Sequence, residues 1–122
     1  MKTIIAISFA TLLSGCSMLS LPSFYDDNES LLAVDVRLAA KNLDCGKDIR
    51  PQVVEVDTTI QRLSLYSESK GSDDVGEIIN LMRETTTGML KKESISPAFC
   101  KIKKKVLVKQ SDDVATAIMG RY

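Results

Sequence analysis

The stretch DIRPQVVEVDTTIQRL, residues 48–63, carries the pattern that decides the fold. Its apolar residues recur at alternating steps of four and three, which is the seam of a helix packed nearly antiparallel to its neighbours. They are Ile49, Val53, Val56, Ile60 and Leu63. Asp48 is a suitable N-cap, and Pro51 falls in the first turn, where no N–H is needed. Several β-branched residues make a strand the competing interpretation, but a strand would alternate at period two.

Similar stripes precede and follow this segment. Asp26 and Glu29 have the spacing of a capping box and open a helix that ends near residues 44–46. Its apolar stripe is Leu32, Val36, Ala39 and Leu43. After a break at residues 70–72, Asp74 and Glu77 offer another cap, and a third helix is expected to run to about Lys92. Its stripe is Val75, Ile78, Met82, Thr85 and Met89, widened by Ile79, Thr86 and Leu90.

The last helix is predicted to begin at Ser96 and Pro97, as N-cap and first helical residue. Its apolar positions are Phe99, Cys100, Ile102, Val106 and Leu107, then Val114, Ala117 and Ile118. Residues 101–110 also fit a short strand followed by a new helix capped at Ser111, although one long helix is the simpler interpretation. Short connections between such helices predict an all-α, up-down bundle of about four helices.

The cysteines bear on both compartment and fold. Once Cys16, which stands in the N-terminal segment described below, is set aside, Cys45 and Cys100 remain as an even pair that an oxidising compartment would join in a disulfide. In an up-down bundle the end of the first helix and the start of the fourth lie at the same pole, which agrees with that pairing. Two free thiols, or a bond to another chain, are the alternatives. Two thiols in a chain without histidine do not make the usual zinc set, and no metal is expected.

The N-terminus has the features of a secretory signal. A short basic segment, Met1 to Thr3, precedes an apolar run from Ile4 to Leu13, which is too short for a bilayer span of about 20 residues. The tetrapeptide Leu13-Ser14-Gly15-Cys16 follows and resembles the lipobox of bacterial lipoprotein precursors. An ordinary signal peptide or an anchor helix with a chance cysteine is the alternative.

The resemblance implies cleavage between Gly15 and Cys16 and attachment of acyl chains such as palmitate at Cys16. In enterobacterial lipoproteins an aspartate after that cysteine signals inner-membrane retention, and here the position is Ser17. The resemblance therefore implies that the lipid anchor lies in the inner leaflet of the outer membrane and that the domain lies in the periplasm. The chain is expected to divide into a leader (1–15), a lipidated tether (16–26) and a helical domain (27–122). The tether can span at most about 35 Å.

Composition gives little support to catalysis or nucleic-acid binding. The chain has 16 basic and 16 acidic residues, and loss of the leader removes only Lys2. The mature chain is therefore nearly neutral and lacks the excess of basic residues that binding to nucleic-acid phosphates requires. Without histidine the commonest general base is missing, so no enzyme activity, cofactor or small-molecule substrate is expected. The acidic pairs at residues 26–27, 73–74 and 112–113 stand near expected helix starts and are interpreted as caps.

The basic run Lys101, Lys103, Lys104, Lys105 and Lys109 fits a solvated helix face, with anionic lipid headgroups or an acidic partner as the other interpretation. In its small size and its lipobox, the chain is similar to small lipoproteins of phages and mobile elements. More specifically, it resembles the outer subunit of a phage spanin, which acts with an inner-membrane partner in host cell lysis. The proline-rich extension of the best-known outer spanin subunits is missing from this chain. A superinfection-exclusion lipoprotein and a structural envelope lipoprotein of the host are the alternatives.

Overall fold

A computed structural model of the chain describes residues 25–121. They form helices α2 (Asp27–Lys41), α3 (Ile49–Lys70), α4 (Gly76–Leu90) and α5 (Pro97–Met119), with a short 3-10 helix, η1 (Asp73–Val75), before α4. This range contains no strand, so residues 101–110 are helical and the expected all-α bundle is confirmed. The expected leader, the lipidation site Cys16 and the tether up to residue 24 lie outside the described residues.

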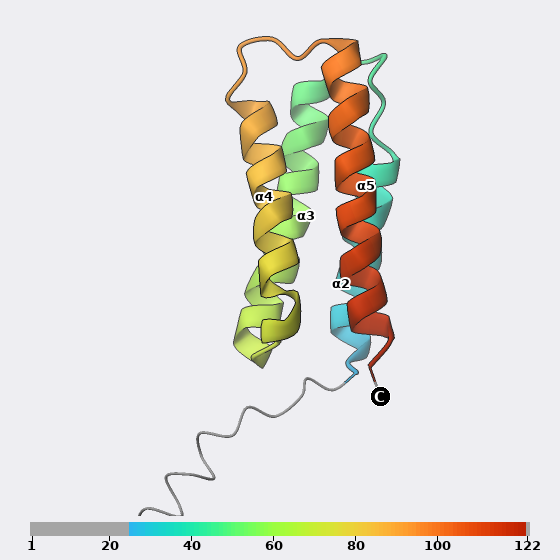
Figure 1. Cartoon of the computed structure of the whole chain (residues 1–122), viewed down its shortest axis with the longest axis vertical. Helices are drawn as coiled ribbons and strands as arrows, with labels where there is room; N and C mark the ends of the chain where they lie inside the picture. The colour runs from blue at the N-terminus through green and yellow to red at the C-terminus, as the bar shows by residue number, and fades with distance from the viewer. Residues whose placement is uncertain (1–24, 122) are drawn as a thin grey trace, which may run out of the picture.

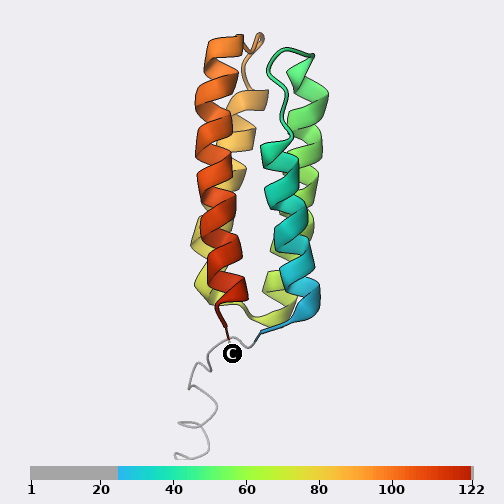
Figure 2. The same ribbon diagram turned by 90° about the vertical axis from the view of Figure 1, so that its right-hand side faces the viewer.

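The helices run up and down around a common core, and each packs against the helix before it and the helix after it, with α5 closing onto α2 (Figure 1). We call one end the disulfide pole: it holds residues 42–48 and 91–100, which connect α2 to α3 and α4 to α5. We call the other end the N-terminal pole: it holds residues 25–29, the turn at residues 70–76 and the C-terminal residues 120–121. Figure 2 shows both connections of the disulfide pole at the same end.

The predicted seam of α3 is confirmed. Ile49, Val53, Val56, Ile60 and Leu63 are all buried. In the neighbouring helices the buried stripe lies slightly to one side of the predicted one. The buried residues are Ala33, Val36 and Ala40 in α2, Leu43 just after it, and Val75, Ile79, Met82, Thr86 and Met89 in η1 and α4. Leu32, Ala39 and Ile78 are only partly buried. Each stripe is wide, and contacts with two neighbours select which part of it turns inward.

Two core positions predicted for α5 are wrong. Ile102 is 61% exposed and Val106 is 37% exposed. The inward side of α5 is set by Cys100, Leu107, Ser111, Val114, Ala115 and Ile118, which are buried. At about 100° per residue, Ile102 lies roughly 200° around the helix from Cys100, and this turns its side chain away from the core.

The helix starts were predicted with mixed success. Ser96 caps α5 through a hydrogen bond from Phe99 N to its Oγ, with Pro97 in the first turn, as expected. The Asp26 carboxylate caps α2 by accepting from the N–H groups of Asn28 and Glu29. Asp48 holds the N-cap position of α3, but its side chain makes no cap hydrogen bond. Asp74 does not cap α4, whose N-cap is Val75.

Candidate functional site

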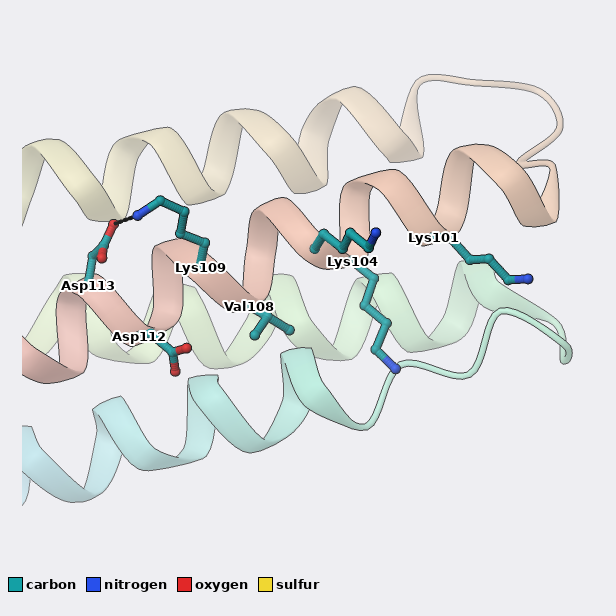
Figure 3. A pocket seen from close by; sticks show the side chains of 7 residues that line it. Lys101, Lys104, Val108, Lys109, Asp112 and Asp113 are labelled. Carbon is teal, nitrogen blue, oxygen red and sulfur yellow. Dashed lines mark hydrogen bonds and ion pairs between the residues drawn. The ribbon is translucent and has the colours of Figure 1, made fainter.

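The lysines of α5 line a shallow groove of about 680 Å³ on the outer surface of the bundle (Figure 3). Because residues three or four apart share one side of a helix, a long helix through residues 101–113 brings cationic side chains into one row. The lining residues are Lys101, Lys104, Lys105, Val108, Lys109, Asp112 and Asp113. Val108, which also lines the groove, is partly buried because it packs against the hydrophobic core. The aliphatic stems of the lysines can cover apolar surface while their amines stay in water.

Contacts with α2 place this groove on the side of α5 that faces the first helix. Just beyond the end of α2, Lys104 Nζ donates to the carbonyl oxygen of Leu43 at 2.7 Å. Arg37 Nε lies 2.6 Å from Asp112 Oδ1, and both side chains are about two-fifths exposed. The groove therefore runs beside α2 from the disulfide pole towards the N-terminal pole.

The positive charge of the groove is only partly compensated. Asp113 pairs with Lys109 at 3.4 Å, and Asp112 pairs with Arg37. Lys104 binds a neutral carbonyl oxygen. Within residues 25–121, Lys101 and Lys105 have no carboxylate within 4.0 Å. In the half of the groove near the disulfide pole, the positive charges of the lysines are therefore not balanced by nearby carboxylates.

A second cluster of charged residues lies at the N-terminal pole, around the fully buried carboxylate of Glu29. The hydroxyl of Ser67 donates to Glu29 Oε2 at 2.9 Å, Lys70 Nζ lies 3.3 Å from Oε1, and Arg121 forms an ion pair with the same carboxylate. Arg121 also binds Asp74 at 2.6 Å. The cluster ties α2, α3, η1 and the C-terminal residues together.

Burial by itself would raise the pKa of Glu29. The hydroxyls of Ser72 and Ser67 and the guanidinium of Arg121 outweigh burial and hold the pKa of Glu29 below its usual range. The hydrogen bond from Tyr66 lowers the pKa of Asp26 in the same way and raises the pKa of Tyr66. These carboxylates are therefore stabilised as anions and held by cations and hydroxyls, an arrangement suited to locking helices together rather than to exchanging protons.

The chain matches no family model, no curated protein and no solved structure. Geometry and sequence alone therefore bear on its function. In the part of the chain that the structure describes, no helix is long and apolar enough to cross a membrane, and no group of three or more potential ligands could hold a metal ion.

Cys45 and Cys100 are joined in a disulfide with their Cα atoms 5.7 Å apart, as predicted. The bond links the α2–α3 connection to the first turn of α5. Cys16 and Gly15, the predicted lipidation and cleavage positions, lie outside the described residues.

Of the three acidic pairs, only residues 26–27 act at the start of an α-helix as predicted. Asp74 lies in η1 and binds Arg121 instead. Asp112 and Asp113 stand in the middle of α5, so their interpretation as caps is wrong, because α5 continues through the point where a new helix could have begun.

Several residues that hold the helices together were not found from the sequence. Arg50 donates to the carbonyl oxygens of Leu90 and Lys92 and thereby caps the end of α4 from the start of α3. Glu29 was expected in a capping box, and Arg121 was not singled out. The sequence did contain a signal that Glu29 is buried, because Glu29 lies on the same side of the helix as Ala33, Val36 and Ala40. A charged residue on an apolar stripe requires a partner of opposite charge.

Proposed function

We propose that this chain is a membrane-anchored lipoprotein, attached through Cys16 after removal of residues 1–15, and that its helical domain is a non-enzymatic interaction module in the periplasm. The observation that carries the proposal is the Cys45–Cys100 disulfide. A structural disulfide fits an oxidising compartment outside the cytoplasm. It also leaves Cys16 as the one cysteine of the sequence outside that bond, and Cys16 stands in the lipobox.

The arrangement of the helices supports a tethered module. The chain enters α2 at the N-terminal pole (Figure 1). The groove lysines Lys101, Lys104 and Lys105 lie on the part of α5 that is nearer the disulfide pole. An anchor at Cys16 would leave the disulfide pole accessible. Serine at position 17 supports the inner leaflet of the outer membrane as the site of attachment.

The absence of catalysis is part of the proposal, and it is supported by how the acidic residues are used. Asp26 caps a helix, Glu29 and Asp74 bind Arg121, and Asp112 binds Arg37. The chain contains no histidine that could act as a general base.

The experiment that tests the anchor is mass spectrometry of the chain purified from membranes. We expect a mature chain that begins at Cys16 and carries acyl chains, and we expect Cys16→Ser to remain unprocessed. Cys45→Ser with Cys100→Ser is the matched control, since it removes two cysteines and leaves the lipobox intact. An intact leader, or an unmodified Cys16 at the mature terminus, would refute the proposal.

Within this class we propose a role in envelope disruption during host cell lysis, like that of an outer spanin subunit acting with an inner-membrane protein. The lipobox followed by a small domain supports this role. The chain expressed alone should leave cells intact, and disruption should appear only when an endolysin and the inner-membrane partner are also present. Protection of cells from adsorbing phage by the chain alone would instead indicate superinfection exclusion, and an envelope defect on its deletion would indicate a structural role.

A further inference from the structure

Cations from two helices that are distant in the sequence meet on one side of the bundle, which we call the α2–α5 face. It contains the lysines of the groove on α5 and, on α2, Arg37 and Lys41. Lys41 follows Arg37 by four residues and therefore shares its side of the helix. The carboxylates in the groove are Asp112 and Asp113, and both already have cationic partners. The groove together with Arg37 and Lys41 therefore holds six cations and two carboxylates, in a domain that is nearly neutral overall.

Exposed apolar side chains accompany these cations. Leu38, next to Arg37, is 52% exposed, and Leu31, two turns earlier on α2, is 64% exposed. Met119, two turns after Asp112 on α5, is 40% exposed. A surface that combines lysines with scattered apolar side chains has the composition of a protein surface that lies in a lipid headgroup region.

The cations of the face are mostly lysines, and this favours an extended anionic surface as the binding partner over a protein that makes specific contacts. Five of the six cations are lysines, Lys41, Lys101, Lys104, Lys105 and Lys109. Lysine is a hydrated, flexible point charge, whereas arginine supplies the rigid fork that specific carboxylate recognition uses. The one arginine, Arg37, is engaged with Asp112 within the domain. Clusters of four to eight basic residues near a bilayer typically bind anionic lipids.

The position of the tether selects which membrane is available. The chain enters the bundle at Asp26, directly before α2, and the tether reaches at most about 35 Å. Helix α5 is itself about 35 Å long at 1.5 Å per residue. A domain lying on its side can therefore place the α2–α5 face on the anchoring membrane without stretching the tether.

We propose that the α2–α5 face rests on the anionic phospholipid headgroups of the same membrane that holds the Cys16 anchor; this rests on the proposed lipid anchor. The lysines then act as a second, electrostatic attachment beside the acyl chains. The attachment holds the domain flat and leaves the opposite side, formed by α3 and α4, turned towards the periplasm.

The test is lysine acetylation of the full mature chain in nanodiscs, read by mass spectrometry. One set of discs contains phosphatidylglycerol with phosphatidylcholine, and the other contains phosphatidylcholine alone. In the anionic discs we expect acetylation of Lys101, Lys105 and Lys109 to slow by about threefold or more, and high salt to abolish the difference. Lys91 at the end of α4 is the internal reference and should react equally in both.

A triple variant gives a second readout. Lys101→Gln, Lys105→Gln and Lys109→Gln together should make the acetylation rate of Lys41 equal in the two kinds of disc. The control removes two exposed cations from α3 and α4 through Arg62→Gln and Arg83→Gln, leaves Lys91 in place as the reference, and should keep Lys41 protected. The mass of the N-terminal peptide reports acylation in the same samples, so failure of the anchor and failure of docking give different results.

Three outcomes would overturn the docking proposal. Equal acetylation in both kinds of disc would show that anionic headgroups do not cover the face. Protection that appears only after empty phosphatidylglycerol vesicles are added would assign the face to a second membrane. Protection that appears only with an added acidic protein would assign it to a protein partner.

Discussion

The carboxylate of Glu29 is the most strongly constrained charge in the described part of the chain. It is fully buried and is held by Ser67, Lys70 and Arg121, which belong to α3 and to the C-terminal residues. A buried ion pair need not be more stabilising than an apolar contact of the same shape. Removing one partner, however, deprives a buried charge of part of its compensation, and this asymmetry determines what a substitution does.

We expect Glu29→Gln to lower the free energy of unfolding by about 3 kcal/mol, because Arg121, whose side chain is 6% exposed, loses a buried partner. Chemical denaturation at neutral pH measures the change. Asp35→Asn, which removes an exposed carboxylate from the same helix, is the control and should change stability by less than about 0.5 kcal/mol. Equal stability of Glu29→Gln and the natural chain would contradict the role of the cluster.

The lowered pKa of Glu29 also predicts a dependence on pH. A carboxyl whose pKa is lower in the folded than in the unfolded chain stabilises the fold above the unfolded value, near 4.5, and this stabilisation is lost as the pH falls through the folded value. The natural chain should therefore lose stability on acidification from about pH 5 to pH 3. Glu29→Gln should show a shallower loss over the same range, with Asp26 accounting for part of the remainder.

At the scale of elements, the α3–α4 connection shows how a single residue ends a helix. Gly71 has a φ of 80°, in the left-handed region, and the N–H groups of Gly71 and Ser72 donate to the carbonyl oxygens of Glu68 and Ser67. This is the hydrogen-bonding pattern of a helix terminated at glycine. Gly88, by contrast, is an ordinary helical residue of α4, and a Cβ added there would meet nothing within 4 Å.

The two glycines should respond to alanine with opposite signs. Gly71→Ala should destabilise the domain by about 1 kcal/mol or more, because an L-residue is strained at positive φ. Gly88→Ala should stabilise it by about 0.5–1 kcal/mol through better helix propensity. Thermal denaturation of both variants against the natural chain measures this pair, and a stabilised Gly71→Ala would show that the turn can adopt another conformation.

At the scale of the whole molecule, the Cys45–Cys100 bond closes the bundle at the end opposite the N-terminal pole. It joins segments 55 residues apart in the sequence, so the entropy of the unfolded chain is strongly reduced when the bond is present. The N-terminal pole has no such bond within residues 25–121 and is held by the Glu29 cluster instead. The two ends of one bundle are therefore secured by different chemistry.

Reduction of the disulfide should lower the free energy of unfolding by about 4 kcal/mol in the chain-entropy estimate. Cys45→Ala with Cys100→Ala should have the same effect while keeping the helical circular dichroism of the natural chain. Denaturant titrations with and without reductant measure it. A reductant-insensitive midpoint would indicate that the bond does not form in the purified protein.

The sequence predicted the elements better than their orientation. Each predicted helix is present, and α3 buries the residues expected of it, because its stripe is narrow and regular. The sides of α2, α4 and α5 that face the core were less well predicted. Each of these helices has a wide apolar stripe, so that more than one set of its positions could have faced the core. The lysines of the groove were visible in the sequence as part of a basic run, although Lys103 of that run does not line the groove. The sequence alone did not show that Arg37 and Lys41 lie beside them.

Apolar spacing, caps and cysteine arithmetic by themselves determined an all-α bundle closed by one disulfide, because these signals act between near neighbours or through a unique pairing. Tertiary structure alone decided that Glu29 is buried with Arg121, that Arg50 caps a distant helix, and that α2 and α5 form one cationic face. Such contacts join residues tens of positions apart, and only the packing of neighbouring helices sets which side chains can meet.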